Sequence, residues 1–399
     1  MTKKSKFHFF ALAAVGVGLS GGDRLFIEFA RRWAKWGNRL DIHLWTEGYN
    51  ITQVQKLQHK NIKFEIVNMG ILPKFGFLVS YIARILAGVM LGLKIKPERL
   101  DIVYSCSDFL MDLLPAFLLK VRFRGKVKWV AGWYQTAPSL LKGFREGKRE
   151  NTYRLTAFFY WLSQKLAKPL ISRFADYVLV NNENERRQFP DHAKKGKTVV
   201  VLGAVDLEKI INYQSLITKH QALIYDAVYQ GRFHPQKGVI ELIDIWAKVV
   251  RKRSSAVLGM IGDGELMSNV VSKIRSKKLE RNIKLFGYLY DGPEKYKIFT
   301  QSKVVVHPAF YDSGGMASAE AMAFGLPAVG FNLKSYKSYY PKGMLKVPVG
   351  DLEKFTEAIL RLLNNEQLRL KLGKEGRGMI LKDWSWDKRA LEVILKITS

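Results

Sequence analysis

The sequence is poor in cysteine and in acidic residues. Cys106 is the one cysteine among 399 residues. This excludes a disulfide framework and a cysteine-based zinc cluster, and it indicates a reducing compartment. The seven histidines show no spacing typical of metal ligands, so we expect no metal and no bound cofactor. Hydrophobic residues at 48% and charged residues at 25% exclude a disordered or low-complexity chain, and this length predicts about two domains.

The shortage of acidic residues leaves a strong positive charge. Lys and Arg number 65 against 35 Asp and Glu, a formal net charge of +30. Such a surplus predicts an acidic partner, which means nucleic acid, an anionic membrane surface or a phosphorylated substrate. No module that reads nucleic acid is recognisable, so we expect no nucleic-acid partner.

The charge is concentrated in the N-terminal half. Residues 1–200 hold 34 Lys and Arg against 15 Asp and Glu. Basic clusters at 120–128, 142–149 and 165–173 alternate with aromatic and aliphatic residues, a combination typical of a surface that touches anionic lipid. A merely solubilising role for these charges stays open.

Long apolar runs are also scarce. The basic start followed by His8 to Gly18 imitates a secretory signal, but the glycines and the helical pattern that follow favour a strand, a glycine loop and a helix. Phe77 to Leu93 is about 17 residues long, near the lower limit for crossing a bilayer, and it contains Arg84. We therefore expect an amphipathic or buried helix there, and a soluble or peripheral protein.

Strand and helix patterns alternate in two series. The first runs from His8 to Leu202 and the second from Ala227 to Gly330, with a linker-like stretch at 206–222 between them. Alternation of this kind predicts an α/β fold of two doubly wound parallel sheets, with ligands at the carboxyl ends of the strands and in the cleft between the halves. The predicted domains are 1–205 and 206–383, and residues 384–399 form a helix that packs back on the first domain.

Two cations flank the first loop of the second series. Arg232 follows a strand, and Lys237 precedes the amphipathic helix that begins after Gly238. A helix N-terminus already favours an anion, so this loop predicts a diphosphate site. A pair of solvated loop cations is the alternative.

Two carboxylates follow a later strand of the second series. Asp312 lies in a loop, Gly314, Gly315 and Met316 open a helix, and Glu320 lies inside that helix. We expect the glycines to let a phosphate or sugar approach free backbone amides, and Glu320 to accept hydrogen bonds from the vicinal hydroxyls of a ribose. Both carboxylates are expected to face one pocket, although a solvent-facing Glu320 stays open.

Other glycine loops are less specific. Gly16, Gly18 and Gly21 satisfy a bare G-x-G-x-x-G after the first strand, and Glu47 follows the second strand, so a nicotinamide dinucleotide site remains an alternative. The segment 262–265 is typical of a turn before a helix, and a structural role there is at least as probable as ligand contact.

Together these motifs resemble glycosyltransferase family 4. The resemblance rests on Gly231-Arg232 with Lys237-Gly238, on Gly262-Asp263-Gly264, on Phe286-Gly287, and on Asp312 and Glu320 eight residues apart before Ala-Met-Ala-x-Gly-x-Pro. It is strong over residues 225–335 and only topological over 50–200. It implies the GT-B fold, with two Rossmann-like domains facing a central cleft, and a retaining, metal-independent transfer of sugar from a nucleoside diphosphate such as a UDP-sugar or GDP-mannose.

The resemblance also implies roles for residues of this chain. Arg232 and Lys237 would hold the donor diphosphate, Glu320 the ribose, and the loop from Asp312 to Met316 the transferred sugar. The donor would also contact Gly21, Gly22, Gly287, Gly314 and Gly315. Asp312, Glu320, Arg232 and Lys237 would act in catalysis.

The chain departs from the family at two positions. Asp312 stands where the family usually has Glu, and no histidine follows the strand that ends near Trp133. Asp108, Tyr134 or Gln135 are the candidates for the missing contact with the sugar or acceptor.

The function that we predict is a glycosyltransferase acting on a lipid-linked or cell-envelope glycan acceptor. It would be cytoplasmic and peripheral on the inner face of the plasma membrane. The alternatives are a nicotinamide-dependent oxidoreductase and a catalytically silent GT-B scaffold protein.

Overall fold

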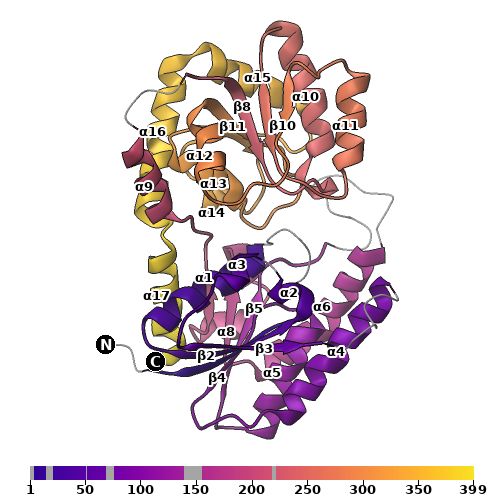
Figure 1. Ribbon diagram of the computed structural model, residues 1–399, viewed down its shortest axis with the longest axis vertical. Helices are drawn as coiled ribbons and strands as arrows, with labels where there is room; N and C mark the ends of the chain where they lie inside the picture. Colours follow the sequence, from indigo (N-terminus) through magenta and orange to yellow (C-terminus); the bar gives the residue numbers. More distant parts are fainter. Residues whose placement is uncertain (1–3, 15–20, 51, 69–75, 139–154, 218–221) are drawn as a thin grey trace. The chain divides into compact units, whose positions relative to one another are not determined.

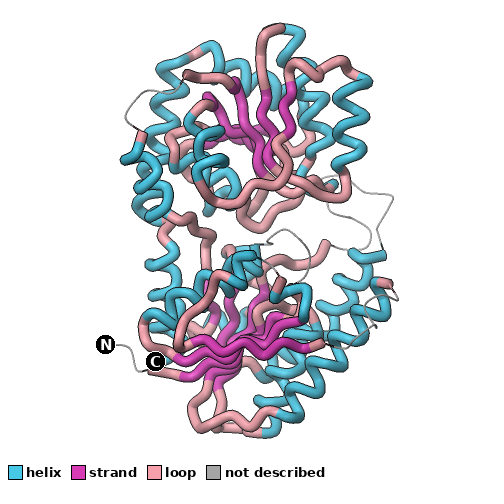
Figure 2. The backbone as a smooth tube through the Cα atoms, in the orientation of Figure 1, coloured by secondary structure: helices cyan, strands magenta, loops and turns pink. Residues whose placement is uncertain are grey.

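The computed structural model describes residues 4–14, 21–50, 52–68, 76–138, 155–217 and 222–399 (Figure 1). The chain divides into two compact units. The first contains Met1–Leu140, Thr152–Val201 and Asp387–Ser399, and the second contains Leu202–Trp386. Each unit has one parallel sheet with helices on its faces (Figure 2).

The sheet of the first unit has seven strands among the described residues, and all its neighbouring strands are parallel. The strands in sheet order are β3 (Ile62–Val67), β2 (Arg39–Trp45), β1 (Lys6–Ala11), β4 (Ile102–Ser105), β5 (Lys128–Trp133), β6 (Tyr177–Val180) and β7 (Thr198–Val200). The order reverses between β1 and β4, which is the switch point of a doubly wound fold.

Aromatic side chains alternate between the two faces of this sheet, as the period of a strand requires. Phe7 packs on Trp33 at 4.9 Å between ring centroids, and Trp129 lies in the core cluster on the other face. The helices of this unit are α1 (Gly21–Lys35), α2 (Thr46–Tyr49), α3 (Thr52–Gln55), α4 (Phe77–Lys94), α5 (Leu110–Arg122), α6 (Leu155–Phe174), α7 (Glu183–Arg186) and α8 (Pro190–Lys194).

The sheet of the second unit has six parallel strands among the described residues. In sheet order they are β10 (Ile283–Leu285), β9 (Leu258–Ile261), β8 (Tyr225–Gln230), β11 (Ser302–His307), β12 (Ala328–Phe331) and β13 (Met344–Val347). The order reverses between β8 and β11, so the loops after these two strands lie at the switch point.

The helices of the second unit include four that we did not expect, namely α9, α12, α14 and α16. The list is α9 (Leu207–Leu216), the 3-10 helix η2 (Pro235–Lys237), α10 (Val239–Lys252), α11 (Met267–Ser276), α12 (Pro293–Thr300), α13 (Met316–Ala323), α14 (Tyr336–Tyr339), α15 (Leu352–Asn364) and α16 (Glu366–Asp383). The stretch 206–222 is therefore not simply a linker, because α9 lies in it and Asp206 caps the helix by accepting from the Lys209 amide. Our sequence analysis also missed α12, α14 and α16.

The last helix, α17 (Trp386–Thr398), belongs to the first unit almost entirely. The Trp33 indole donates to the Ala390 carbonyl oxygen at 3.0 Å, and Arg32 forms an ion pair with Asp387 at 2.9 Å. The last residues of the chain thus contribute to the core of the unit that contains its first strand. The cleft that we predict between the two halves stays a prediction.

Candidate active site

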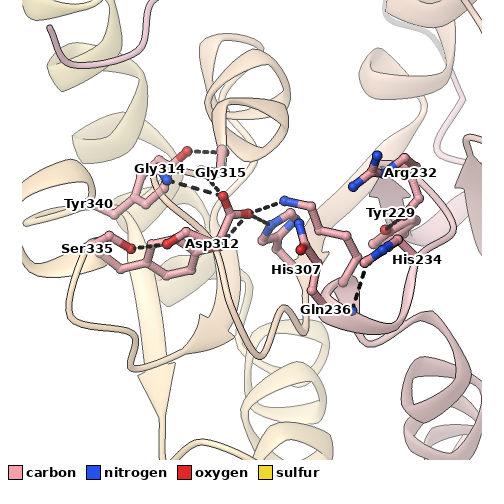
Figure 3. Close-up of polar contacts among 12 residues, drawn as sticks. Tyr229, Arg232, His234, Gln236, His307, Asp312, Gly314, Gly315, Ser335 and Tyr340 are labelled. Carbon is pink, nitrogen blue, oxygen red and sulfur yellow. Dashed lines mark hydrogen bonds and ion pairs between the residues drawn. The ribbon is translucent and has the colours of Figure 1, made fainter. Parts of the chain in front are cut away.

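The candidate site lies at the carboxyl ends of β8 and β11, which are neighbours in the second sheet. The loop after β8 carries Arg232 and Lys237, and the loop after β11 carries Asp312. Because parallel strands end at the same edge of a sheet, the two loops meet there (Figure 3). Lys237 and Asp312, 75 residues apart in the chain, form an ion pair at 2.6 Å between Nζ and Oδ2.

Asp312 is the centre of this arrangement. Its Oδ2 also accepts from His307 Nε2 at 2.9 Å and from the Tyr336 hydroxyl at 3.3 Å. Its Oδ1 accepts from the amides of Gly314 at 3.2 Å and Gly315 at 3.0 Å. A carboxylate offers about four lone-pair sites, so five donors saturate it.

The charge states at this centre follow from burial and pairing. Burial acts to raise the pKa of Asp312, but the charge of Lys237 and the hydrogen bond from His307 outweigh it and hold the pKa well below its usual range. Burial lowers the pKa of His307, with Asp312 opposing. A neutral His307 donates through Nε2, because the carboxylate can only accept. The centre therefore holds one negative charge, on Asp312, and one positive charge, on Lys237, in direct contact.

Our expectation of free glycine amides at this helix is wrong. The amides of Gly314 and Gly315 are used by Asp312, and the Tyr340 hydroxyl donates to the Gly315 carbonyl oxygen. Gly315 is in the left-handed conformation at φ 59°, where glycine is favoured. These glycines shape the turn that holds Asp312, and a role for Gly314, Gly315 and Met316 in donor binding stays a prediction.

The second carboxylate belongs to a separate cluster. Glu320, on α13, is 2% exposed, so it is not a solvent-facing residue. Its Oε2 accepts from Lys295 Nζ at 2.7 Å and from Gln230 Nε2 at 2.9 Å. Lys295, also 2% exposed, pairs with Asp291 as well. A ribose diol that used both oxygens of Glu320 would have to displace one of these donors.

The remaining donor-site residues of the second unit lie at the same edge of the sheet. Arg232 is exposed, and its carbonyl oxygen accepts from the Tyr229 hydroxyl at 3.3 Å. The Gly262 amide donates to the Gly287 carbonyl oxygen at 2.8 Å, which ties together the loops after β9 and β10. The structure therefore brings Arg232, Lys237, Gly287 and Asp312 to one edge of one sheet.

The candidate acceptor residues are held inside the first unit. Asp108 is 4% exposed and accepts from Gln164 Nε2 at 2.7 Å, and burial raises its pKa to about 7. The Tyr134 hydroxyl is hydrogen bonded to that of Tyr104. The Gln135 carbonyl oxygen accepts from Gln164 at 2.8 Å. Tyr134 is therefore poorly placed for a polar contact with a sugar, and the roles of Asp108 and Gln135 stay predictions.

The N-terminal glycine loop is only partly described. Gly16 and Gly18 lie outside the described residues, whereas Gly21 and Gly22 form the first turn of α1. Glu47 is exposed in α2 after β2. Among the residues that the structure describes, no group of three or more His, Cys, Asp or Glu side chains is placed to hold a metal ion, and the expected independence from metal stays a prediction.

Our sequence analysis missed six contributors to the two clusters. Around Asp312 they are His307, Tyr336 and Ser335, whose hydroxyl donates to the Asp312 carbonyl oxygen at 2.7 Å. Around Glu320 they are Gln230, Lys295 and Asp291. His307 at the end of β11 and Gln230 at the end of β8 had a visible signal, since polar residues at strand ends in such sheets face ligands. The other four come from segments with no recognisable motif.

Comparison with known proteins identifies the fold of the chain and a family model that matches one region of it. Residues 224–379 match the family model for Glycosyl transferases group 1. HepE of Anabaena, solved with UDP and glucose, superposes with a TM-score of 0.72 at 14% identity, covering 100% of both chains. TarM of S. aureus gives 0.69 at 13% identity, again over 100% of both chains. The chain has the GT-B fold.

Curated relatives agree over part of the chain. A poly(ribitol-phosphate) α-N-acetylglucosaminyltransferase of Staphylococcus aureus is 26% identical over 46% of this chain and 38% of its own length. The capsular polysaccharide glycosyltransferase CapM of Staphylococcus aureus is 23% identical over 65% of this chain and 70% of its own length. The chain spans less than two thirds of the length of the first such relatives. The predicted similarity to glycosyltransferases is confirmed for the second unit, and assignment to family 4 stays a prediction.

Proposed function

We propose that the protein is a glycosyltransferase that moves a sugar from a nucleoside diphosphate to a hydroxyl of a cell-envelope glycan. The observation that carries the proposal is the meeting of Lys237 and Asp312 at the switch point of the sheet, inside the region that matches Glycosyl transferases group 1. Similarity to proteins named for polymers of the cell envelope supports the acceptor class.

In this proposal two cations bind the donor diphosphate. An ammonium has three donors, and only one bond of Lys237 is used by Asp312, so the others can meet phosphate oxygens. Arg232, exposed at the same edge, supplies a planar second cation. Negative charge grows on the leaving diphosphate during transfer, and cations fixed beforehand stabilise it.

Asp312 acts in this proposal by positioning Lys237. A carboxylate with five donors and a strongly lowered pKa is a poor base and a poor nucleophile. Its charge instead fixes the ammonium and the turn at Gly314 and Gly315. We therefore infer that the reacting atoms meet Lys237 and Arg232 rather than the Asp312 side chain, and that the reaction retains the anomeric configuration, as the family resemblance implies.

Binding of uridine and guanosine diphosphates tests the proposal. One or both should raise the unfolding temperature of the second unit. Lys237→Ala and Arg232→Ala should each weaken diphosphate binding by about tenfold to a hundredfold, since a hydrogen bond to a charged group contributes about 1.5–3 kcal/mol. Lys248→Ala is the control, because Lys248 lies on α10 of the same unit and pairs with Glu353.

The outcome of these measurements is decisive for the site. If neither diphosphate binds, or if both site variants bind as tightly as the Lys248 control, the donor site is placed wrongly. Transfer from a UDP-sugar or GDP-mannose to an envelope glycan then follows as the assay of activity. The acceptor is proposed to be lipid-linked and the protein to work at the cytoplasmic face of the membrane.

A further inference from the structure

The helix α4 has an unusual distribution of side-chain size. Four of its six buried residues are small, namely Ala83, Ala87, Gly88 and Gly92, and the other two are Tyr81 and Arg84. A Cβ added at Gly92 would lie 2.9 Å from the Pro115 Cα atom of α5, so the two helices are closely packed. Large apolar side chains point outward, which is the reverse of the usual pattern for a helix on a globular surface.

The outward side chains form a continuous stripe. They are Leu78, Ile82, Leu86, Met90 and Leu93, with exposed fractions of 50, 48, 51, 62 and 54%. Residues four apart lie on one face of a helix, and the stripe is about 22 Å long at 1.5 Å per residue. Scattered exposed leucines are normal, but a contiguous apolar surface marks an interaction site.

The helix α6 also exposes apolar side chains. Phe158, Leu162 and Leu166 are exposed by 37, 38 and 54%. The rings of Phe77 and Phe159 have centroids 6.4 Å apart, so α4 and α6 approach each other at one end (Figure 1). We call the exposed sides of α4 and α6 the α4–α6 face.

The exposed charges on the helices α4, α5 and α6 have one sign. The helices α4, α5 and α6 contain one acidic residue, Asp112, which is 1% exposed. The exposed cations on these helices are Lys94, Arg122, Lys165 and Arg173. Lys165 lies 5.4 Å from the ring centroid of Trp161, and a cation beside a tryptophan is typical of the membrane interface. An apolar stripe in a group of helices whose exposed charges are all cations matches an anionic lipid surface.

We propose that the α4–α6 face docks on an anionic phospholipid bilayer. The apolar stripe enters the boundary between head groups and acyl chains, and the exposed cations of α4, α5 and α6 contact lipid phosphates. By length and composition α4 is apolar enough to cross a membrane. It lies flat instead, because Arg84 in its middle is 5% exposed and the helix is fixed along α5. A second copy of the chain is a poorer occupant, since its own cations would meet these.

The role of this docking rests on the proposed function, because it would hold the enzyme beside a lipid-linked acceptor. The physical binding does not depend on catalysis. The test is flotation of the full chain with vesicles of phosphatidylcholine, with and without phosphatidylglycerol. We expect binding only to the anionic vesicles, and weaker binding at 1 M salt, where the screening length falls to about 3 Å.

Two variants locate the contact. Leu86→Glu and Met90→Glu should each reduce partition into anionic vesicles about tenfold or more. Each replaces an apolar side chain that would enter the bilayer with a carboxylate that the anionic lipids repel. Leu370→Glu is the matched control, because Leu370 is 62% exposed like Met90 but lies on α16 of the second unit. It should bind vesicles like the wild type. Circular dichroism and nucleotide binding should be unchanged in all three variants.

Several results would overturn the proposal. They are a wild type that does not float, equal binding to neutral and anionic vesicles, and stripe variants that bind like Leu370→Glu. If the wild type sediments as a dimer and Met90→Glu dissociates that dimer, the face binds a second copy of the chain, and this result also rejects the bilayer. Because diphosphate binding is measured on the same samples, loss of vesicle binding alone leaves the proposed function intact, and loss of diphosphate binding alone leaves the docking intact.

Discussion

Asp312 determines how much of the candidate site can tolerate substitution. Five donors converge on its two oxygens, and two of them are backbone amides that no substitution of a side chain removes. Breaking a buried ion pair by removing one partner is costly, because the remaining charge stays buried without compensation. The carboxylate is thus as important for the stability of the second unit as for binding.

Asp312→Asn should lower the free energy of unfolding of the second unit by about 3 kcal/mol or more. The amide would place its own donors against Lys237 and His307. Denaturation in urea measures the change. Glu353→Gln is the control, since Glu353 is 69% exposed and its pair with Lys248 should contribute less than about 1 kcal/mol. A loss in Asp312→Asn no larger than in this control would contradict the central role of Asp312.

Asp108 predicts a pH dependence in the first unit. Burial raises its folded-state pKa to about 7 from the usual 3.8. Between these values the folded chain binds a proton that the unfolded chain does not, so this carboxyl makes stability fall as pH rises from about 4 to about 7.

Asp108→Asn should remove that slope, about 1.4 kcal/mol per pH unit at its steepest. The variant should therefore gain stability relative to the wild type as the pH rises from about 4 to about 7, and the difference should level off above that. Urea denaturation of the first unit at each pH gives the comparison. Asp191→Asn, at an exposed position on α8, serves as the control. A stability difference between Asp108→Asn and the wild type that does not change with pH would refute the raised pKa.

At the scale of elements, the loop between β8 and α10 depends on Gly238. Its φ is 66°, and an added Cβ would overlap the Pro308 carbonyl oxygen in the loop that leads to Asp312. Glycine is needed here for both reasons. The residue lets two loops approach closely enough for Lys237 to reach Asp312.

Gly238→Ala should therefore destabilise the second unit by more than about 1 kcal/mol and weaken diphosphate binding together. Thermal unfolding with and without diphosphate reports both effects. Gly378→Ala is the contrasting control, because Gly378 lies in α16 with nothing within 4 Å of an added Cβ. It should raise stability by about 0.5–1 kcal/mol. Normal diphosphate binding in Gly238→Ala would show that the close approach is not required.

The sequence predicted the elements whose signal is local. Alternating apolar patterns located both sheets, and the motif loops were assigned to the ends of β8 and β11, where the structure has them. The helix α16 was missed because Gly373, Gly376 and Gly378 lower its helical propensity. Gly373 is needed for contact, since an added Cβ would overlap the Gly325 carbonyl oxygen. A glycine that is needed for contact with a residue distant in the sequence lowers the helical propensity of its own segment, so the segment does not look helical.

The partners of the candidate carboxylates were not predictable for a related reason. Lys295 reaches Glu320 from a helix 25 residues earlier, and Tyr336 reaches Asp312 from a segment 24 residues later. Their spacing depends on the path of the chain between the elements, which no periodicity records. Asp312 was visible because it follows a strand and precedes two glycines, and Glu320 was visible because it is the one charged residue in an otherwise apolar helix.

At the scale of the whole molecule, the positive charge divides into two parts. Arg232 and Lys237 serve the candidate donor site in the second unit, whereas the exposed cations of α4, α5 and α6 belong to the helices that carry the apolar face of the first unit. The two groups have different partners in our proposals, a soluble diphosphate and a lipid surface. Because the two groups of cations bind different partners, the salt dependence of vesicle binding should be unchanged by a substitution in the diphosphate site, and the reverse should also hold.

The path of the chain couples its end to the first unit. The helix α17 follows the second unit in sequence, yet it packs in the first through Trp33 and Arg32. Ile394 and Leu395 are adjacent in α17, with Ile394 fully buried and Leu395 51% exposed. They provide a matched pair for asking which unit depends on the helix.

Ile394→Ala should lower the free energy of unfolding of the first unit by about 2–5 kcal/mol, because it leaves a cavity in a close-packed core. Leu395→Ala should change it by less than about 0.5 kcal/mol. Diphosphate at 100 times its dissociation constant should still stabilise the second unit by about 2.7 kcal/mol in both variants, since no residue of the donor site is altered. Calorimetry with and without diphosphate separates the two transitions. A fall in the diphosphate-sensitive transition of Ile394→Ala, with the other unchanged, would assign α17 to the second unit instead.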